Sequence, residues 1–402
     1  MIGRVLAARA LRAFADGFIA VVLPAYLLAL GLGQLEVGFI STATLLGSAL
    51  STLAVGRWGH RFSIRRLLLA AALLMAATGL AFAGLSSLWP LMLVAFVSTL
   101  NPSGGETSVF LPLEHTVLAA ETPDAVRTTV FARYSFAGSI FGAVGALATA
   151  VPEALAVRGA MSMLDALRLM FVAYAGIGLT VWVLYLRMPE PRTEVKKAAA
   201  PLGPSRGIVW RLAGLFSLDS FAGGLTLNSM LALWLFERFG MSLTAAGAFF
   251  FWTGLFSATS QLAAPILARR IGLVNTMVFT HIPASLCLIG AALAPTLELA
   301  LGLLLARSAL SQMDVPARSA FVMSVVTPAE RPAAASFTAV PRSLASAVSP
   351  SLTGAMFAAG AMAAPLVLCG VLKIAYDFAL FASMGKKEKG LRAASQAPVE
   401  KL

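Results

Sequence analysis

Ionisable residues inside long apolar stretches are the part of this sequence that could do chemistry. An ionisable side chain costs about 3 kcal/mol at the centre of a membrane-spanning helix, so such residues are expected to pair or to work. A carboxyl group that titrates while it faces each side of a membrane in turn supplies the coupling that proton-driven transport requires. Four carboxylates are candidates for this role: Asp16, Glu106, Asp219 and Asp314.

Glu106 is the best single candidate for carrying a proton. It follows the helix-breaking string Asn-Pro-Ser-Gly-Gly at 101–105. Interrupted helices of this kind expose backbone groups at transport sites. The alternative places Glu106 near the outer surface, where it is simply solvated.

Asp314 and Arg318 are four residues apart, so they share one helical face and are expected to pair. Pro316 between them interrupts the backbone hydrogen bonds of that helix. Two interpretations stay open, a substrate or proton site and a structural ion pair that anchors the helix to Arg342. Arg133, Arg318 and Arg342 together offer buried positive charge to an organic anion.

Other charged residues are expected to have structural roles. Glu114 lies in reach of Arg133, and we expect a structural pair there. His281 is alone on an apolar stretch and is expected to be a satisfied interior histidine. Two more pairs have the four-residue spacing of helix ion pairs, Arg12 with Asp16 and Lys373 with Asp377.

Aromatic and small polar residues on the first, fifth and seventh apolar stretches are expected to line a cavity. Such a cavity, mostly apolar and with few charges, would suit an amphipathic organic substrate. The alternative is that these residues pack the helices together. The candidates are Phe18, Tyr26, Tyr134, Phe221, Asn228 and Trp234.

The elements that hold these residues are expected to be membrane-spanning helices. Of 402 residues, 59% are hydrophobic and only 12% are charged, which is unusual for a water-soluble domain. A spanning helix needs about 20 mainly apolar residues, and lipid leaves backbone groups no partners outside the helix. We predict an all-α integral membrane protein of twelve such helices, at 6–30, 36–56, 66–86, 90–120, 127–150, 165–187, 209–237, 241–267, 274–295, 297–326, 332–358 and 364–385.

The net charge of +12 is concentrated at alternate breaks between these stretches, whereas four intervening breaks, at 31–36, 86–89, 294–298 and 359–364, contain no Lys or Arg. By the positive-inside rule, both termini and the long central loop are cytoplasmic. This pattern explains the charge without nucleic acid. We expect a multi-pass protein of the bacterial inner (plasma) membrane with a six-helix bundle at 1–188, a cytoplasmic linker at 189–208, a second six-helix bundle at 209–386 and a cytoplasmic tail at 387–402.

The two halves of the chain resemble each other. The sequence Thr-Pro followed by Arg occurs at 122–127 and again at 327–331, about 204 residues later. Asp16 and Asp219 are 203 residues apart, and each precedes a phenylalanine by two positions. Matches in the same order at nearly one offset predict two structurally repeated halves, which is typical of transporters.

The loop at 56–66 resembles the signature of the major facilitator superfamily, Gly-x-x-x-Asp-Arg-x-Gly-Arg-Lys/Arg-Arg. His60 stands where the family has Asp, and Ser63 where it has Gly. The resemblance implies two pseudo-symmetric bundles that move by alternating access, with this loop as a cytoplasmic latch. The residues expected to form that gate are Gly56, His60, Arg61, Arg65, Arg66, Glu114, Arg269 and Arg270.

The glycine-rich string at 138–145 is similar to a motif of drug:proton antiporters in the same superfamily, although Ala143 replaces its proline. Small residues at this spacing also let helices pack closely. The resemblance implies proton-coupled efflux of a small amphipathic organic molecule. Uptake of a small organic anion with protons, and a non-transporting membrane sensor or scaffold, are the alternatives.

Several functions are disfavoured by what the sequence lacks. We find no phosphate-binding Gly-x-x-x-x-Gly-Lys-Ser/Thr loop, no His/Cys metal cluster and no Gly-x-Ser-x-Gly nucleophile turn. We therefore expect no enzyme, no cofactor and no metal. The expected partners are a small-molecule substrate, protons and the lipid bilayer, with the chain acting as a monomer.

Overall fold

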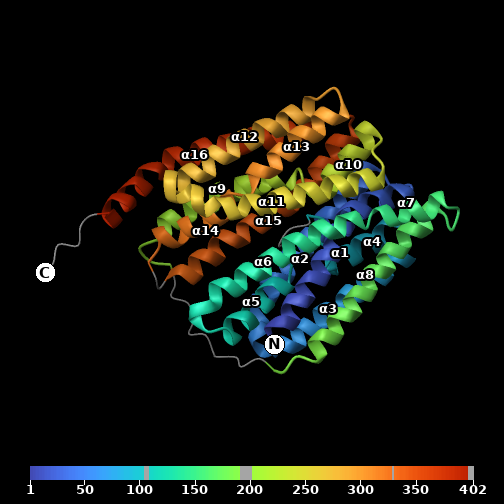
Figure 1. Cartoon of the computed structure of the whole chain (residues 1–402), viewed down its shortest axis with the longest axis horizontal. Helices are drawn as coiled ribbons and strands as arrows, with labels where there is room; N and C mark the ends of the chain where they lie inside the picture. Colours follow the sequence, from blue (N-terminus) through green and yellow to red (C-terminus); the bar gives the residue numbers. More distant parts are fainter. Residues whose placement is uncertain (104–107, 191–201, 328–329, 397–402) are drawn as a thin grey trace. The chain divides into compact units, whose positions relative to one another are not determined.

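The computed structural model describes residues 1–103, 108–190, 202–327 and 330–396. This part of the chain is mostly helical and contains no β-strand, which confirms the predicted all-α class. A short 3₁₀ turn, Gly59–Arg61, follows the second helix. The helices (Figure 1) are α1 Ile2–Ala29, α2 Gln34–Trp58, α3 Ile64–Gly84, α4 Leu88–Val97, α5 Phe110–Glu121, α6 Asp124–Leu147, α7 Ala150–Val157, α8 Met163–Leu186, α9 Arg206–Gly224, α10 Asn228–Phe239, α11 Leu243–Ile271, α12 Leu273–Leu293, α13 Leu297–Ser311, α14 Asp314–Val325, α15 Arg331–Ala358 and α16 Ala364–Gln396.

Seven helical segments in the described residues are long and apolar enough to cross a membrane. Three of the predicted spans, 90–120, 209–237 and 297–326, are each divided into two shorter helices. Proline explains two of these divisions. The ring of a proline clashes with the carbonyl four residues earlier, so Pro112 and Pro316 lie just inside the starts of α5 and α14 rather than within a longer helix.

The described chain forms two compact units. Unit 1 comprises 1–197, 223–255 and 343–365, and unit 2 comprises 198–222, 256–342 and 366–402. Small residues allow the close packing inside unit 1. A Cβ added to Gly38 of α2 would lie 2.5 Å from the carbonyl oxygen of Pro350 and 3.1 Å from the Cα of Gly354, both on α15. Glycine is therefore required at this crossing.

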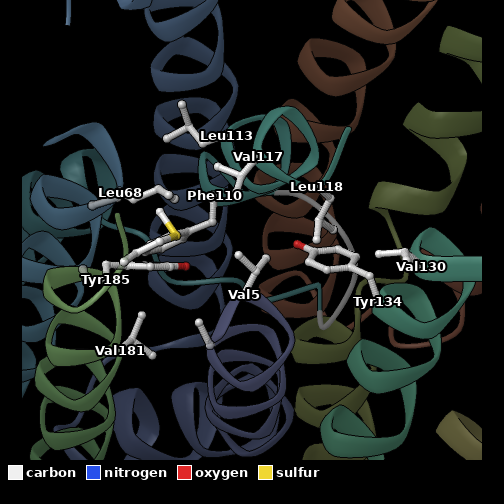
Figure 2. Close-up of a cluster of buried hydrophobic side chains, with 14 residues drawn as sticks. Val5, Leu68, Phe110, Leu113, Val117, Leu118, Val130, Tyr134, Val181 and Tyr185 are labelled. Carbon is white, nitrogen blue, oxygen red and sulfur yellow. The ribbon is translucent and has the colours of Figure 1, made fainter. Parts of the chain in front are cut away.

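One hydrophobic core of unit 1 gathers around α5 and is shown in Figure 2. Phe110, Leu113 and Val117 of α5 pack against Val5 of α1 and Leu68 of α3, and α6 and α8 add one tyrosine each. Figure 2 shows the two phenol oxygens turned toward the middle of this core. A polar group must therefore lie among these apolar side chains.

The internal repeat predicted from the sequence is visible in the local structure of α5, of α14 and of the turns that follow them. Helices α5 and α14 are both 12 residues long, and they begin 204 residues apart (314 − 110). Arg127 donates to the carbonyl oxygen of Ala119 at 3.3 Å, and Arg331 donates to that of Met323 at 3.2 Å. Each arginine thus reaches back eight residues to the end of the preceding helix, so the two turns have the same architecture.

Candidate functional site

The candidate site is a buried group of charged side chains in unit 2, which we call the Asp219 cluster. At its centre, Asp219 of α9 uses both carboxylate oxygens. Oδ2 accepts a hydrogen bond from Nη1 of Arg318 on α14 at 3.0 Å, and Oδ1 accepts one from Nζ of Lys373 on α16 at 2.7 Å. The members of the cluster are Asp219, His281, Asp314, Arg318, Lys373 and Asp377, and all six side chains are buried.

The short helix α14 positions Arg318. Asp314 is its first residue, and its Oδ2 lies 3.4 Å from Nη1 of Arg318, which confirms the pairing predicted from their spacing. The guanidinium also lies over the ring of Phe216, 5.7 Å from its centroid. Arg318 is therefore held between two carboxylates and an aromatic face. Arg342, expected to join this pair, instead donates from Nε to the hydroxyl of Ser220 at 3.0 Å.

His281 of α12 extends the cluster, which the sequence did not predict. Its Nδ1 lies 3.1 Å from Oδ1 of Asp377, and its Nε2 lies 3.2 Å from Nζ of Lys373. His281 is thus satisfied, as expected, but by charged partners. The prediction of a Lys373–Asp377 ion pair was wrong, because Lys373 pairs with Asp219 and Asp377 with His281, each on another helix.

A second buried group, the Glu114 cluster, lies in unit 1 beside the core of Figure 2. It comprises Arg12, Glu114, Tyr134 and Tyr185. Glu114 forms an ion pair with Arg12 and accepts hydrogen bonds from the hydroxyls of Tyr134 at 2.5 Å and Tyr185 at 2.6 Å. The guanidinium of Arg12 lies over the ring of Phe110, 4.1 Å from its centroid. Tyr134 and Tyr185 thus supply the polar group that this core required.

Two predicted pairings are corrected by this geometry. Glu114 binds Arg12 rather than Arg133, whose side chain is exposed. Arg12 correspondingly forms its ion pair with Glu114 of α5, so the expected Arg12–Asp16 pair is replaced by one between helices. Asp16 is buried nearby, in contact with the side chain of Asn101.

The two clusters occupy related positions in the repeat. Glu114 and Arg318 are 204 residues apart (318 − 114), and each is the fifth residue of its 12-residue helix. Glu114 pairs with a cation on α1, whereas Arg318 pairs with an anion on α9. The helix contact is therefore kept in both halves while its polarity is reversed.

Comparisons with known proteins identify the family. A family model described as Major Facilitator Superfamily matches residues 5–313. This chain belongs to the major facilitator superfamily. An uncharacterised membrane protein of Saccharomyces cerevisiae is 22% identical to it, and the alignment covers 92% of this chain and 91% of the yeast protein. The superfamily resemblance of the sequence is thereby confirmed, and the chain is a membrane transporter of this kind.

Solved structures of other superfamily members share the fold of this chain. A bacterial homologue of the human lysosomal transporter Spinster, in an inward-facing and occupied conformation, is 17% identical, with a TM-score of 0.74 over 96% of this chain and 97% of that one. A D-xylose–proton symporter is also 17% identical, with a TM-score of 0.73 over 94% of this chain and 97% of that one. At these identities the likeness concerns the fold alone.

The residues predicted to line a substrate cavity or to carry a proton differ in burial. Tyr26 is buried and donates to the carbonyl oxygens of Phe82 at 2.5 Å and Leu85 at 3.0 Å, so it ties α1 to the end of α3. Phe18 and Trp234 are also buried in unit 1, whereas Phe221 and Asn228 are half-buried. Glu106 lies outside the described residues.

The residues predicted to form a gate are spread over both units. Arg65 donates to the carbonyl oxygens of Tyr185 at 3.3 Å and of Leu186, so it holds the start of α3 to the end of α8. Glu114 is buried in its cluster. The side chain of His60 lies outside the described residues. Gly56, Arg61, Arg66, Arg269 and Arg270 lie near the ends of α2, α3 and α11.

A pocket of about 290 Å³ lies beside Arg269, in unit 2. Arg269 and Pro265 of α11, Leu273 of α12 and Pro316 of α14 are among its lining residues. The lining is otherwise mostly alanine, so the pocket is apolar with one basic group at its edge.

Proposed function

We propose that this chain is a proton-coupled carrier that works by alternating access and exports a small amphipathic organic molecule. The observation that supports it most is Asp219, a buried carboxylate whose two oxygens bind cations from two other helices. One proton on Asp219 would weaken both contacts at once. Proton binding can therefore favour one arrangement of α9, α14 and α16 over another, which is what coupling requires.

The charge balance of unit 2 supports an amphipathic substrate. With His281 neutral, the three carboxylates of the Asp219 cluster offset Arg318, Lys373 and the neighbouring Arg342. Arg318 and Lys373 are engaged with carboxylates, so little positive charge is left over for a ligand. A site of this kind favours apolar contacts with a few oriented polar groups.

The second candidate function is uptake of a small organic anion together with protons. Arg342 favours it, because this half-buried guanidinium donates to a hydroxyl and has no carboxylate at ion-pair distance among the described residues. A carboxylate or phosphate of a substrate could take that place, since arginine matches both groups with paired N–H donors.

We place both termini in the cytoplasm of a bacterium, with the protein acting as a monomer in the inner membrane. The concentration of Lys and Arg at alternate loops supports this orientation. The same orientation would put the loop at 56–66 and the arginines at 269–270 on the cytoplasmic side, as a gate there requires.

The test begins with a thermal-shift screen of purified protein at two pH values. Lipophilic cations, neutral amphiphiles and organic anions are screened separately, because binding to the folded state raises the melting temperature. The compound that binds is then followed in proteoliposomes under an imposed pH gradient. Flux that follows the gradient supports the proposal, and export or uptake is read from its direction.

The matched variants are Asp219→Asn and Glu298→Gln. Glu298 is an exposed carboxylate at the start of α13, so its removal is expected to leave flux unchanged. Asp219→Asn is expected to abolish gradient-driven flux. Flux that stays the same when the gradient is reversed would exclude proton coupling, and no flux of any binding compound would favour a sensor or scaffold.

A further inference from the structure

The contact between His281 and Asp377 is not needed for the proton binding proposed at Asp219, and it contains an unsatisfied group. Asp377 is fully buried, and its Oδ1 lies 3.1 Å from Nδ1 of His281. Its second oxygen, Oδ2, is buried without a hydrogen-bond partner in the described part of the chain, as is the hydroxyl of Tyr376 beside it. A buried carboxylate oxygen without a donor is costly, so a ligand that satisfies it is expected.

The neighbouring ammonium fixes the state of the histidine ring. Lys373 has donors only, and its Nζ lies 3.2 Å from Nε2 of His281, so Nε2 must accept. The ring proton is therefore on Nδ1, from which it is donated to Oδ1 of Asp377. A neutral imidazole thus faces an ammonium on one side and a carboxylate on the other.

Several helices around this pair contribute charged or titratable groups, and on the far side of α12 the helix α13 adds Arg307, which interacts with Cys369 and Cys287. Asp219 comes from α9, and its Oδ1 lies 3.8 Å from Nε2 of His281. Helix α14 adds Asp314 and Arg318, α15 adds Arg342, and α16 adds Cys369, Lys373 and Tyr376. The charges of Asp219, Asp314 and Asp377 balance those of Arg318, Arg342 and Lys373, and one carboxylate oxygen of Asp377 has no donor among the described residues.

We propose that the His281–Asp377 pair is a proton-binding site, with the proton on Oδ2 of Asp377. The inference rests on the proton coupling proposed above and gives that function a second site. A proton there turns a buried carboxylate into a neutral acid whose remaining C=O still accepts from Nδ1 of His281. Lys373 then faces one carboxylate fewer, so its contact with Oδ1 of Asp219, 2.7 Å long, is strengthened.

The consequence is a link between two protons. Lys373 contacts both His281 and Asp219. Protonation of Asp377 therefore changes how strongly Lys373 is held at Asp219, and with it how readily Asp219 binds a proton or a substrate. A proton at Asp377 holds Lys373 on Asp219 and keeps that carboxylate ionised. The pair thus adjusts how strongly Lys373 holds Asp219 and does not replace Asp219 as the group that exchanges its cations.

Infrared difference spectroscopy tests the site without any substrate. The full-length protein in lipid nanodiscs is titrated from alkaline to acidic pH, and the C=O stretch of protonated carboxyl groups is followed in D₂O. Asp377 is buried, so its band is expected to shift slowly on deuterium exchange. Asp377→Asn removes that slow band, whereas Glu298→Gln, which deletes an exposed carboxylate, leaves it in place.

A second variant keeps the test valid if Asp377→Asn does not fold. In His281→Leu the carboxyl C=O loses the N–H donor 3.1 Å away, so the slow band is expected at higher frequency. A slow band of the same intensity in Asp377→Asn, or of the same frequency in His281→Leu, overturns the proposal. A slow band that sodium suppresses and choline does not also overturns it, in favour of a sodium site.

The spectrum separates this inference from the proposed function. If the slowly exchanging band does not come from Asp377, the proton site is refuted. Gradient-driven flux is still tested separately, because the infrared experiment measures no transport. Flux without proton dependence beside an intact Asp377 band would refute the proposed coupling and leave the proton site standing.

Discussion

Replacing Asp219 by asparagine is expected to destabilise the folded protein by about 3 kcal/mol. Removing one partner of a buried ion pair costs about 3–5 kcal/mol, because it leaves an uncompensated charge. The lower end applies here, since Arg318 keeps Asp314 at 3.4 Å and Lys373 keeps Nε2 of His281 at 3.2 Å. At about 2.1 cal/mol/K of unfolding entropy per residue, a loss of this size lowers the melting temperature of a 402-residue chain by about 3.5 °C.

A double variant shows whether charge is the cause. Asp219→Asn combined with Lys373→Met removes the stranded ammonium together with the carboxylate. Replacing both members of a buried pair by groups of similar volume is often neutral or stabilising, so the double variant is expected to melt above the single one. Tryptophan fluorescence during thermal unfolding in nanodiscs measures both.

Asp165→Asn is the matched control. Asp165 is exposed and pairs with half-buried Arg168 at 3.4 Å, a kind of surface contact worth under about 1 kcal/mol. An Asp219→Asn protein that melts with this control would refute the reasoning. A double variant less stable than the single one would show that shape rather than charge dominates the site.

Three further predictions follow from other contacts. Glu114→Gln leaves Arg12 without its ion pair and is expected to lower the melting temperature by several degrees, whereas Arg133→Ala, at an exposed side chain, is expected to leave it unchanged. Hydrogen bonds from the hydroxyls of Ser205 and Thr327 lower the pKa of Glu330, in the turn before α15, to about 2. Its contribution to stability is therefore full above the ordinary pKa near 4.5 and is lost as pH falls toward 2, so the melting difference between the unchanged protein and Glu330→Gln should shrink over that interval. Gly47→Val should abolish folding or expression, because even a Cβ at Gly47 would lie 1.6 Å from the carbonyl oxygen of Phe96, and fluorescence size-exclusion chromatography would detect a tolerated variant.

Much of the fold follows from the sequence, because apolar length and loop charge act locally. The helical class and the superfamily were both predicted and are confirmed. Among the three divided spans, interruptions were expected at 101–105 and at Pro316, and none was expected at 209–237. Pro112 and Pro316 marked two of them, since proline cannot lie four residues after a helical carbonyl without strain. The drug:proton antiporter branch stays a prediction.

The pairing of charges was harder to predict, because spacing along one helix defines a face but not its neighbour. Asp314 and Arg318 do pair as their spacing indicates. Lys373 has the same spacing from Asp377, yet Lys373 binds Asp219 of α9 and Asp377 binds His281 of α12. His281 could have been recognised as part of a cluster only by asking which buried charges lacked partners. The candidate cavity and gate residues stay predictions.

Glu114 and Arg318 occupy equivalent positions but carry opposite charges, so the equivalent helices of the two halves are not interchangeable. A hybrid with α5 in place of α14 would set a glutamate against Asp219, and one with α14 in place of α5 would set an arginine against Arg12. Either hybrid would bring like charges together in a place that water does not reach. Although the two halves are alike in architecture, α5 can therefore pair only with α1 and α14 only with α9.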